Sequence, residues 1–108
     1  MNVTLISTYD LGHQPFGLAS LAAWLGAEGA HVVCNDTAVC ALDDDAVRSA
    51  NLICIHLAMH TATRLALELM PRIRALNGGA HICFFGLYGP PNADALSAYA
   101  PCSVIGGE

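Results

Sequence analysis

The stretch that decides the fold is Leu52-Ile53-Cys54-Ile55-His56, which is followed by a long helical pattern over Thr61–Asn77. A strand that is apolar on both faces is typical of a parallel sheet covered by helices on both sides. The helical segment carries an apolar stripe at helical spacing: Ala62, Leu65, Ala66, Leu69, Ile73 and Leu76. On its other side Glu68 and Arg72 stand four residues apart and predict an ion pair, and Pro71 predicts a kink.

The same alternation extends in both directions from this unit. Strands are predicted at Val3–Ser7, His31–Asn35, Leu52–His56, Ile82–Phe85 and Ser103–Ile105. Helices are predicted at residues 16–28, with Pro15 in the first turn and Gly29 at the end, from Asp43 as N-cap to Ser49, at Thr61–Asn77 and at Ala93–Tyr99. This β-α order predicts an α/β, flavodoxin-like (Rossmann-like) doubly wound parallel five-stranded sheet with strand order 2-1-3-4-5.

Composition narrows the classes of partner. The 108 residues, 55% hydrophobic and 12% charged, suit a single domain over residues 1–108. The net charge of -5 and the absence of Lys/Arg clusters argue against nucleic-acid binding, and no apolar run is long enough to span a membrane. The odd number of cysteines, five, without a C-x-x-C motif indicates reduced thiols and a cytoplasmic location.

Loops at the carboxyl ends of the predicted strands form the candidate binding edge. They carry Tyr9, His13, His60 and Tyr88, together with several glycines that allow close approach of a bulky ligand. His56 stands at a strand end, where contact with a ligand and a core role bonded to backbone are both open. His31 and His81 precede strands at the opposite edge and are expected on the surface.

Several chemistries are excluded by their missing motifs. The chain has neither G-x-x-x-x-G-K-[ST] nor G-x-G-x-x-G, and no G-x-S-x-G. A receiver domain needs Asp at the end of the third strand, where this chain has His56, and no Ser/Thr-rich phosphate loop follows the first strand, which weakens an FMN assignment. No histidine pair has the spacing of a protein-bound metal site, so neither a metal site nor a catalytic residue is predicted.

The helix at residues 16–28 is almost free of polar side chains, although an outer helix of a small domain normally carries charge. We therefore expect its outer side, with Trp24, to pack against another domain or against a second copy in a homo-oligomer.

Motifs spread along the chain resemble the N-terminal cobalamin (B12)-binding domain of B12-type radical SAM proteins. They are Gln14-Pro15-Phe16-Gly17-Leu18, Ala22-Ala23-Trp24-Leu25, Ile55-His56-Leu57-Ala58-Met59-His60-Thr61 and Gly106-Gly107-Glu108. The segments around Ser7–Pro15 and Met59–Arg64 are similar to a subgroup whose members end in a Cys-Cys-Ala-Glu-Pro-like tail.

The resemblance implies a cobalamin-binding module that catalyses nothing alone and was excised or truncated from a longer enzyme. It implies S-adenosylmethionine and a [4Fe–4S] cluster only in a downstream radical SAM barrel, because no C-x-x-x-C-x-x-C is present here. The cofactor-binding residues that it implies are Ser7, Tyr9, His13, Gln14, Pro15, Gly17, His56, Leu57, Ala58, Met59, His60, Thr61, Gly86, Leu87, Tyr88, Gly89, Gly106 and Gly107.

Two departures from the family pattern matter. The D-x-H-x-x-G motif is absent, so cobalamin is expected to bind without a protein histidine on cobalt. Leu87-Tyr88 replaces residues that are usually small. The alternative is therefore a flavodoxin-like interaction domain that has lost its cofactor.

Overall fold

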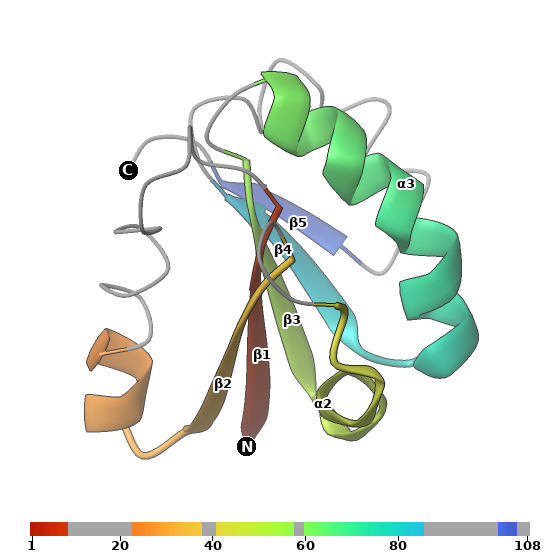
Figure 1. The fold of residues 1–108 in the computed structure, drawn as a ribbon. Coiled ribbons are helices and arrows are strands. Elements are labelled where there is room, and N and C mark those ends of the chain that lie inside the picture. Colours follow the sequence, from red (N-terminus) through yellow and green to blue (C-terminus); the bar gives the residue numbers. More distant parts are fainter. Residues whose placement is uncertain (9–22, 38–40, 58–59, 86–101, 106–108) are drawn as a thin grey trace.

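The computed structural model describes residues 1–8, 23–37, 41–57, 60–85 and 102–105 (Figure 1). Its strands are β1 (Asn2–Ser7), β2 (His31–Asp36), β3 (Leu52–His56), β4 (His81–Phe85) and β5 (Cys102–Ile105). They form one sheet in the order β2-β1-β3-β4-β5, and every neighbouring pair is parallel. The predicted α/β class and the parallel order of the first four strands are confirmed, with bounds that agree within one residue.

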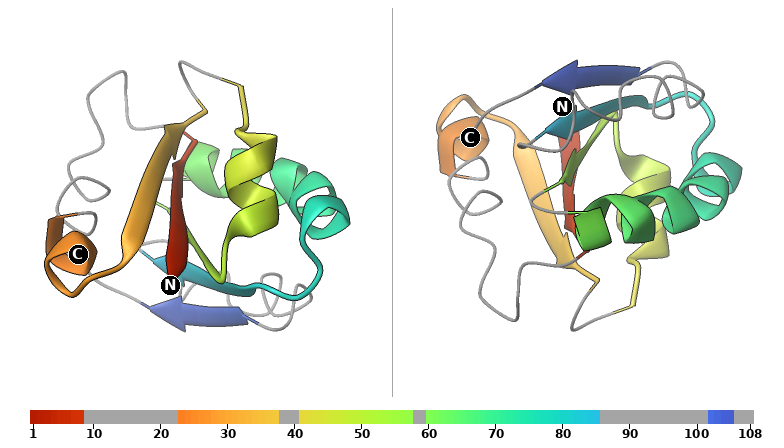
Figure 2. Two further views of the ribbon diagram at one scale, coloured as in Figure 1. Left: turned by 90° about the horizontal axis from the view of Figure 1, so that it is seen from below. Right: turned by 90° about the horizontal axis from the view of Figure 1, so that it is seen from above.

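Helices lie on both faces of this sheet. The helices α2 (Asp44–Ser49) and α3 (His60–Leu76) lie on one face, and the helical residues 23–27 lie on the other (Figures 1 and 2). The predicted helix at Ala93–Tyr99 and the first part of the helix at 16–28 fall outside the described residues.

Alternation along the strands divides the core into two layers. Under α2 and α3, the fully buried residues include Ile6, Ile53, Ile55, Ile82 and Phe84 from the strands, with Val47, Ala66, Met70 and Ile73 from the helices. On the opposite face a smaller cluster contains Val3, Leu5 and Cys54, and partly buried Leu25, Val32 and Phe85 pack against it. Apolar burial of this kind stabilises the fold by roughly 25 cal/mol per Å².

The helix ends follow local sequence rules. Asp43 caps α2 as predicted, because its side chain accepts a hydrogen bond from the backbone N–H of Ala46 at 3.1 Å. Asp44 and Asp45 then place negative charge in the first turn, where the helix dipole favours it. Gly29, with φ of 91°, supplies the left-handed residue after the helical residues 23–27.

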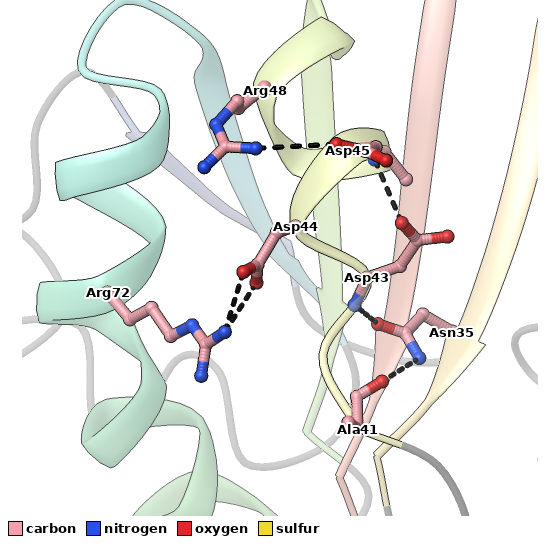
Figure 3. A network of polar contacts seen from close by, with 8 residues as sticks. Asn35, Ala41, Asp43, Asp44, Asp45, Arg48 and Arg72 are labelled. Carbon is pink, nitrogen blue, oxygen red and sulfur yellow. Dashed lines mark hydrogen bonds and ion pairs between the residues drawn. The ribbon is translucent and has the colours of Figure 1, made fainter.

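One predicted ion pair is wrong. Arg72 pairs with Asp44 on α2, at 2.7 Å to each carboxylate oxygen, and not with Glu68 on its own helix (Figure 3). The rule for residues four apart considers one helix alone, whereas the fold brings α2 within reach of α3. The helix α3 also continues through Pro71 to Leu76.

The side chains of Asn77 and Asn51 tie together the amino-terminal edge of the sheet and the loops beside it. Asn77 donates to the carbonyls of Val47 and Ala50, both at 2.8 Å, and accepts from the backbone N–H groups of Gly79 and Ala80. At the start of β1, the N–H of Asn2 donates to Oδ1 of Asn51 at 2.9 Å. Backbone groups that neither strand nor helix satisfies are thereby paired. Within the described ranges, no helix combines the length and the apolar character needed to cross a membrane.

Candidate functional site

Four residues from four strands form a row at the carboxyl edge of the sheet. Ser7 at the end of β1 is in register with Asp36 on β2 and with His56 on β3, and His56 is in register with Phe85 on β4. Because residues in register on parallel strands share a face, this row continues the face that contains Leu5 and Cys54. The strand order reverses between β1 and β3, which makes Ser7 and His56 the two residues at the switch point, where ligands of open α/β sheets bind.

The end of β1 is closely packed. Ser7 and Thr8 are 1% and 2% exposed, and the carbonyl of Ser7 accepts hydrogen bonds from the N–H of Thr37 at 2.8 Å and from its Oγ1 at 3.2 Å. The chain leaving β2 is thereby tied to the end of β1. A fixed backbone at this point gives the edge a defined shape before any ligand arrives.

An aromatic pair stands beside Ser7. The rings of His56 and Phe85 stack with centroids 4.9 Å apart and an interplanar angle of 21°. The backbone N–H of Leu57 donates to the carbonyl of Phe85 at 2.7 Å, which ties the ends of β3 and β4 together. Both rings are half-buried, so they present an aromatic edge that can contact a flat or apolar ligand.

The predicted site residues within the described ranges differ in their surroundings. Ser7 and His56 are brought side by side in register. Leu57 has its side chain fully buried in the core under α2 and α3, and its N–H is already bonded to Phe85. His60 and Thr61 begin α3. The other predicted site residues lie outside the described residues: Tyr9, His13, Gln14, Pro15, Gly17, Ala58, Met59, Gly86, Leu87, Tyr88, Gly89, Gly106 and Gly107.

Sequence reasoning missed Phe85 and Asp36 at this edge. Each is the last residue of a strand, so the topological rule that selected His56 also covers them. The glycines and loop residues carried more conspicuous signals than these strand ends. Phe85 matters most of the two, because its ring stacks on that of His56.

In the part of the chain that the structure describes, no group of three or more His, Cys, Asp or Glu residues could hold a metal ion. The edge residues offer a stacked aromatic pair beside a buried hydroxyl residue and one carboxylate, which is an arrangement for holding a ligand. Comparisons of the chain with protein-family models, with curated proteins and with solved structures found no match.

Proposed function

We propose that this chain is the cobalamin-binding module of a B12-dependent radical SAM enzyme, with a flavodoxin-like, doubly wound five-stranded sheet. The observation that supports it most is the register of Ser7 with His56 at the switch point of the parallel sheet. The cofactor lies over the carboxyl ends of the strands, with its nucleotide tail entering between β1 and β3. The motif resemblance supports cobalamin as the ligand, and the parallel topology supports binding at the switch point.

The described residues at this edge suit such a ligand. A corrin with its tail is a large group that combines apolar surface with many amide substituents. The stacked rings of His56 and Phe85 offer apolar contact, and Ser7 stands beside them as a small, buried residue. These residues orient the cofactor and exclude water from one side, while the cobalt supplies the methyl-transfer or radical chemistry of the intact enzyme.

The cobalt is bound without a protein histidine in this proposal. The ring of His56 is stacked on Phe85, and His31 and His81 stand at the first residues of β2 and β4, at the opposite edge. A cobalt–imidazole band in the visible spectrum of the loaded protein, lost in His13→Ala, would contradict this part.

The direct test is to mix the full chain with hydroxocobalamin, remove free cofactor by desalting, and record the visible spectrum. Corrin absorbance that stays with the protein is the expected result, and a colourless protein overturns the proposal. His56→Ala should weaken binding about 10-fold, the magnitude of a lost stacking contact. The matched control is His81→Ala, a histidine that is exposed at the amino-terminal edge, and it should bind as the parent chain does.

We further propose that this module belongs to a longer parent protein. A coding sequence after Glu108 that contains C-x-x-x-C-x-x-C would support a downstream barrel that holds the [4Fe–4S] cluster and S-adenosylmethionine. The thiols of Cys34, Cys54 and Cys83 are free, which supports a cytoplasmic enzyme.

One observation favours a second function, an interaction domain that has lost its cofactor. Trp24 is 62% exposed on the helical residues 23–27, and Ala23 and Ala27 beside it are also exposed, while Leu25 packs toward the sheet. Exposed tryptophan is enriched at protein interfaces. A colourless protein that sediments as a dimer, and that becomes a monomer in Trp24→Ser, would support this function over cofactor binding. A flavin in place of hydroxocobalamin tests the FMN assignment in the same way.

A further inference from the structure

Two cysteines stand side by side in the middle of the sheet. Cys54 on β3 is in register with Cys83 on β4, and their side chains are hydrogen-bonded to each other. Cys54 is 3% exposed, whereas Cys83 is half-buried.

The surroundings of the pair are apolar. Both cysteines lie on the same face of the sheet as Leu5. Leu25, Leu52 and Phe85 pack against the cluster on this face. An apolar environment penalises a strongly hydrated ion such as Mg²⁺ more than a soft, weakly hydrated one. Thiolate sulfur is itself a soft ligand, so the environment and the donor atoms select the same class of cation.

Cys34, the third cysteine whose side chain the structure describes, stands apart from the pair. Cys34 on β2 is exposed and is in register with Leu5 on β1, which separates it from Cys54 on β3. With neighbouring strands about 4.8 Å apart, two strand spacings put the Cα atoms of Cys34 and Cys54 roughly 10 Å apart. The pair therefore offers two sulfur ligands without a third from Cys34, which does not suit the tetrahedral four-ligand site that structural zinc requires.

The hydrogen bond prepares one thiolate. Donation from the Cys54 thiol holds the pKa of Cys83 below the usual range of a thiol. The same bond, followed by burial and by repulsion from Cys83, raises the pKa of Cys54. Binding of one cation by both sulfurs requires that both thiols lose their protons, and the register of Cys54 with Cys83 places the two side chains beside each other for this.

We propose that Cys54 and Cys83 form a two-coordinate site for a soft, monovalent, thiophilic cation of the Cu(I) class, held between β3 and β4. On binding, both S–H bonds break, two Cu–S bonds form, and two protons pass to the solvent. No electron is transferred, and the site gains a net charge of minus one. This site is independent of the cofactor proposal, because it stands in the middle of the strands and not at their carboxyl edge.

The test is a titration of the full chain with Cu(I) delivered from its bicinchoninate complex under argon, followed by the loss of the absorbance of that complex. One tightly bound Cu(I) per chain is expected, with a thiolate-to-copper absorption in the ultraviolet. Cys83→Ser should lower the affinity at least 100-fold. Cys34→Ser is the matched control on the same face of the sheet, and it should retain the tight site.

A second measurement keeps the proposal testable if Cys83→Ser does not fold. After one equivalent of Cu(I), the parent chain is treated with iodoacetamide and digested, and the alkylated cysteines are identified by mass spectrometry. Protection of Cys83 that depends on the added Cu(I), with Cys34 still reactive, supports the site. Tight binding retained in Cys83→Ser, or protection of Cys34 instead of the pair, overturns it.

Discussion

Arg72 on α3 donates to both carboxylate oxygens of Asp44 on α2, at 2.7 Å each, and so joins the two helices that cover one face of the sheet (Figure 3). The side chains of Arg72 and Asp44 are 58% and 34% exposed, so solvent screens much of their attraction.

Arg72→Gln should therefore lower the free energy of unfolding by about 0.5 kcal/mol, and by no more than about 1 kcal/mol, with most of the effect lost in high salt. Urea denaturation at two salt concentrations measures it. Arg48→Gln is the control, because Arg48 pairs with the almost fully exposed Asp45 at 3.3 Å within α2, and its removal should have no measurable effect. Equal losses from both variants would contradict this ranking.

Asn77 should be among the most sensitive polar residues of the described chain. Its Nδ2 donates to two backbone carbonyls at 2.8 Å, and its Oδ1 accepts from two backbone N–H groups. Asn77→Ala leaves these groups without partners, at an expected cost of about 2–3 kcal/mol.

Asn77→Asp distinguishes the two halves of this network. A carboxylate can still accept from Gly79 and Ala80, but it cannot donate to Val47 and Ala50. We expect it to unfold at a denaturant concentration no higher than Asn77→Ala, because a negative charge is then placed beside two carbonyl oxygens. Recovery of most of the stability in Asn77→Asp would show that the accepting half dominates.

Gly26 and Gly29 should respond in opposite directions to alanine. Gly26 lies in the helical residues 23–27, and an added Cβ there meets no atom within 4 Å. Gly26→Ala should raise the free energy of unfolding by about 0.5–1 kcal/mol, because alanine favours the helix. Gly29 has φ of 91°, so Gly29→Ala should lower it by about 1 kcal/mol. Thermal unfolding followed by circular dichroism compares the pair, and a change of the same sign in both would refute the conformational argument.

Alkylation should reveal the shared proton of the thiol pair. Because the hydrogen bond from Cys54 lowers the pKa of Cys83, the rate of Cys83 alkylation should rise at lower pH than that of an ordinary thiol. In Cys54→Ala the donor is gone, and the pH at which the rate rises should move upward. Peptide mass spectrometry after timed iodoacetamide treatment gives both profiles, and an unchanged profile in the variant would exclude the hydrogen bond as the cause.

The same thiols affect stability in alkaline solution. A raised pKa in the folded state means that Cys54 contributes stability below the pKa of the unfolded thiol and loses it as the pH rises through its folded pKa. Cys83, with a lowered pKa, contributes stability that is fully present above the pKa of the unfolded thiol and is lost as the pH falls through its folded pKa. The two contributions therefore oppose each other in alkaline solution. Because the hydrogen bond to Cys83 is the first cause of the raised pKa of Cys54, Cys83→Ser should reduce both contributions and make the alkaline change in stability shallower, as urea denaturation at several alkaline pH values would measure.

Much of the fold could be predicted from local patterns. Leu52–His56 was predicted at its observed bounds, since a short run that is apolar on both faces has few other structures available in a small α/β chain. Asp43 was predicted as a cap because capping depends on three or four consecutive residues. The pairing of Arg72 with Asp44 could not be predicted, because it depends on where α2 packs against α3.

The candidate site, like the fold, could be predicted only in part. The topological rule selected His56 at the end of its strand, and the motif resemblance added Ser7, which the structure places in register with it. The stacking of His56 on Phe85 and the pairing of Cys54 with Cys83 depend on register, which no local pattern in this chain encodes. The identity of the ligand rests on motif resemblance, and it stays a prediction that the hydroxocobalamin experiment tests.

The place of β1 between β2 and β3 has a consequence for synthesis on the ribosome. Both neighbours follow β1 in the chain, and the edge of β1 that pairs with β3 stays open until His56 has been translated. Long-range parallel pairing is slow to form, which prolongs the time in which the apolar residues Val3, Leu5 and Ile6 can contact other nascent chains. Ribosome-bound chains halted before β3 should therefore recruit chaperones more strongly than chains halted after Phe85.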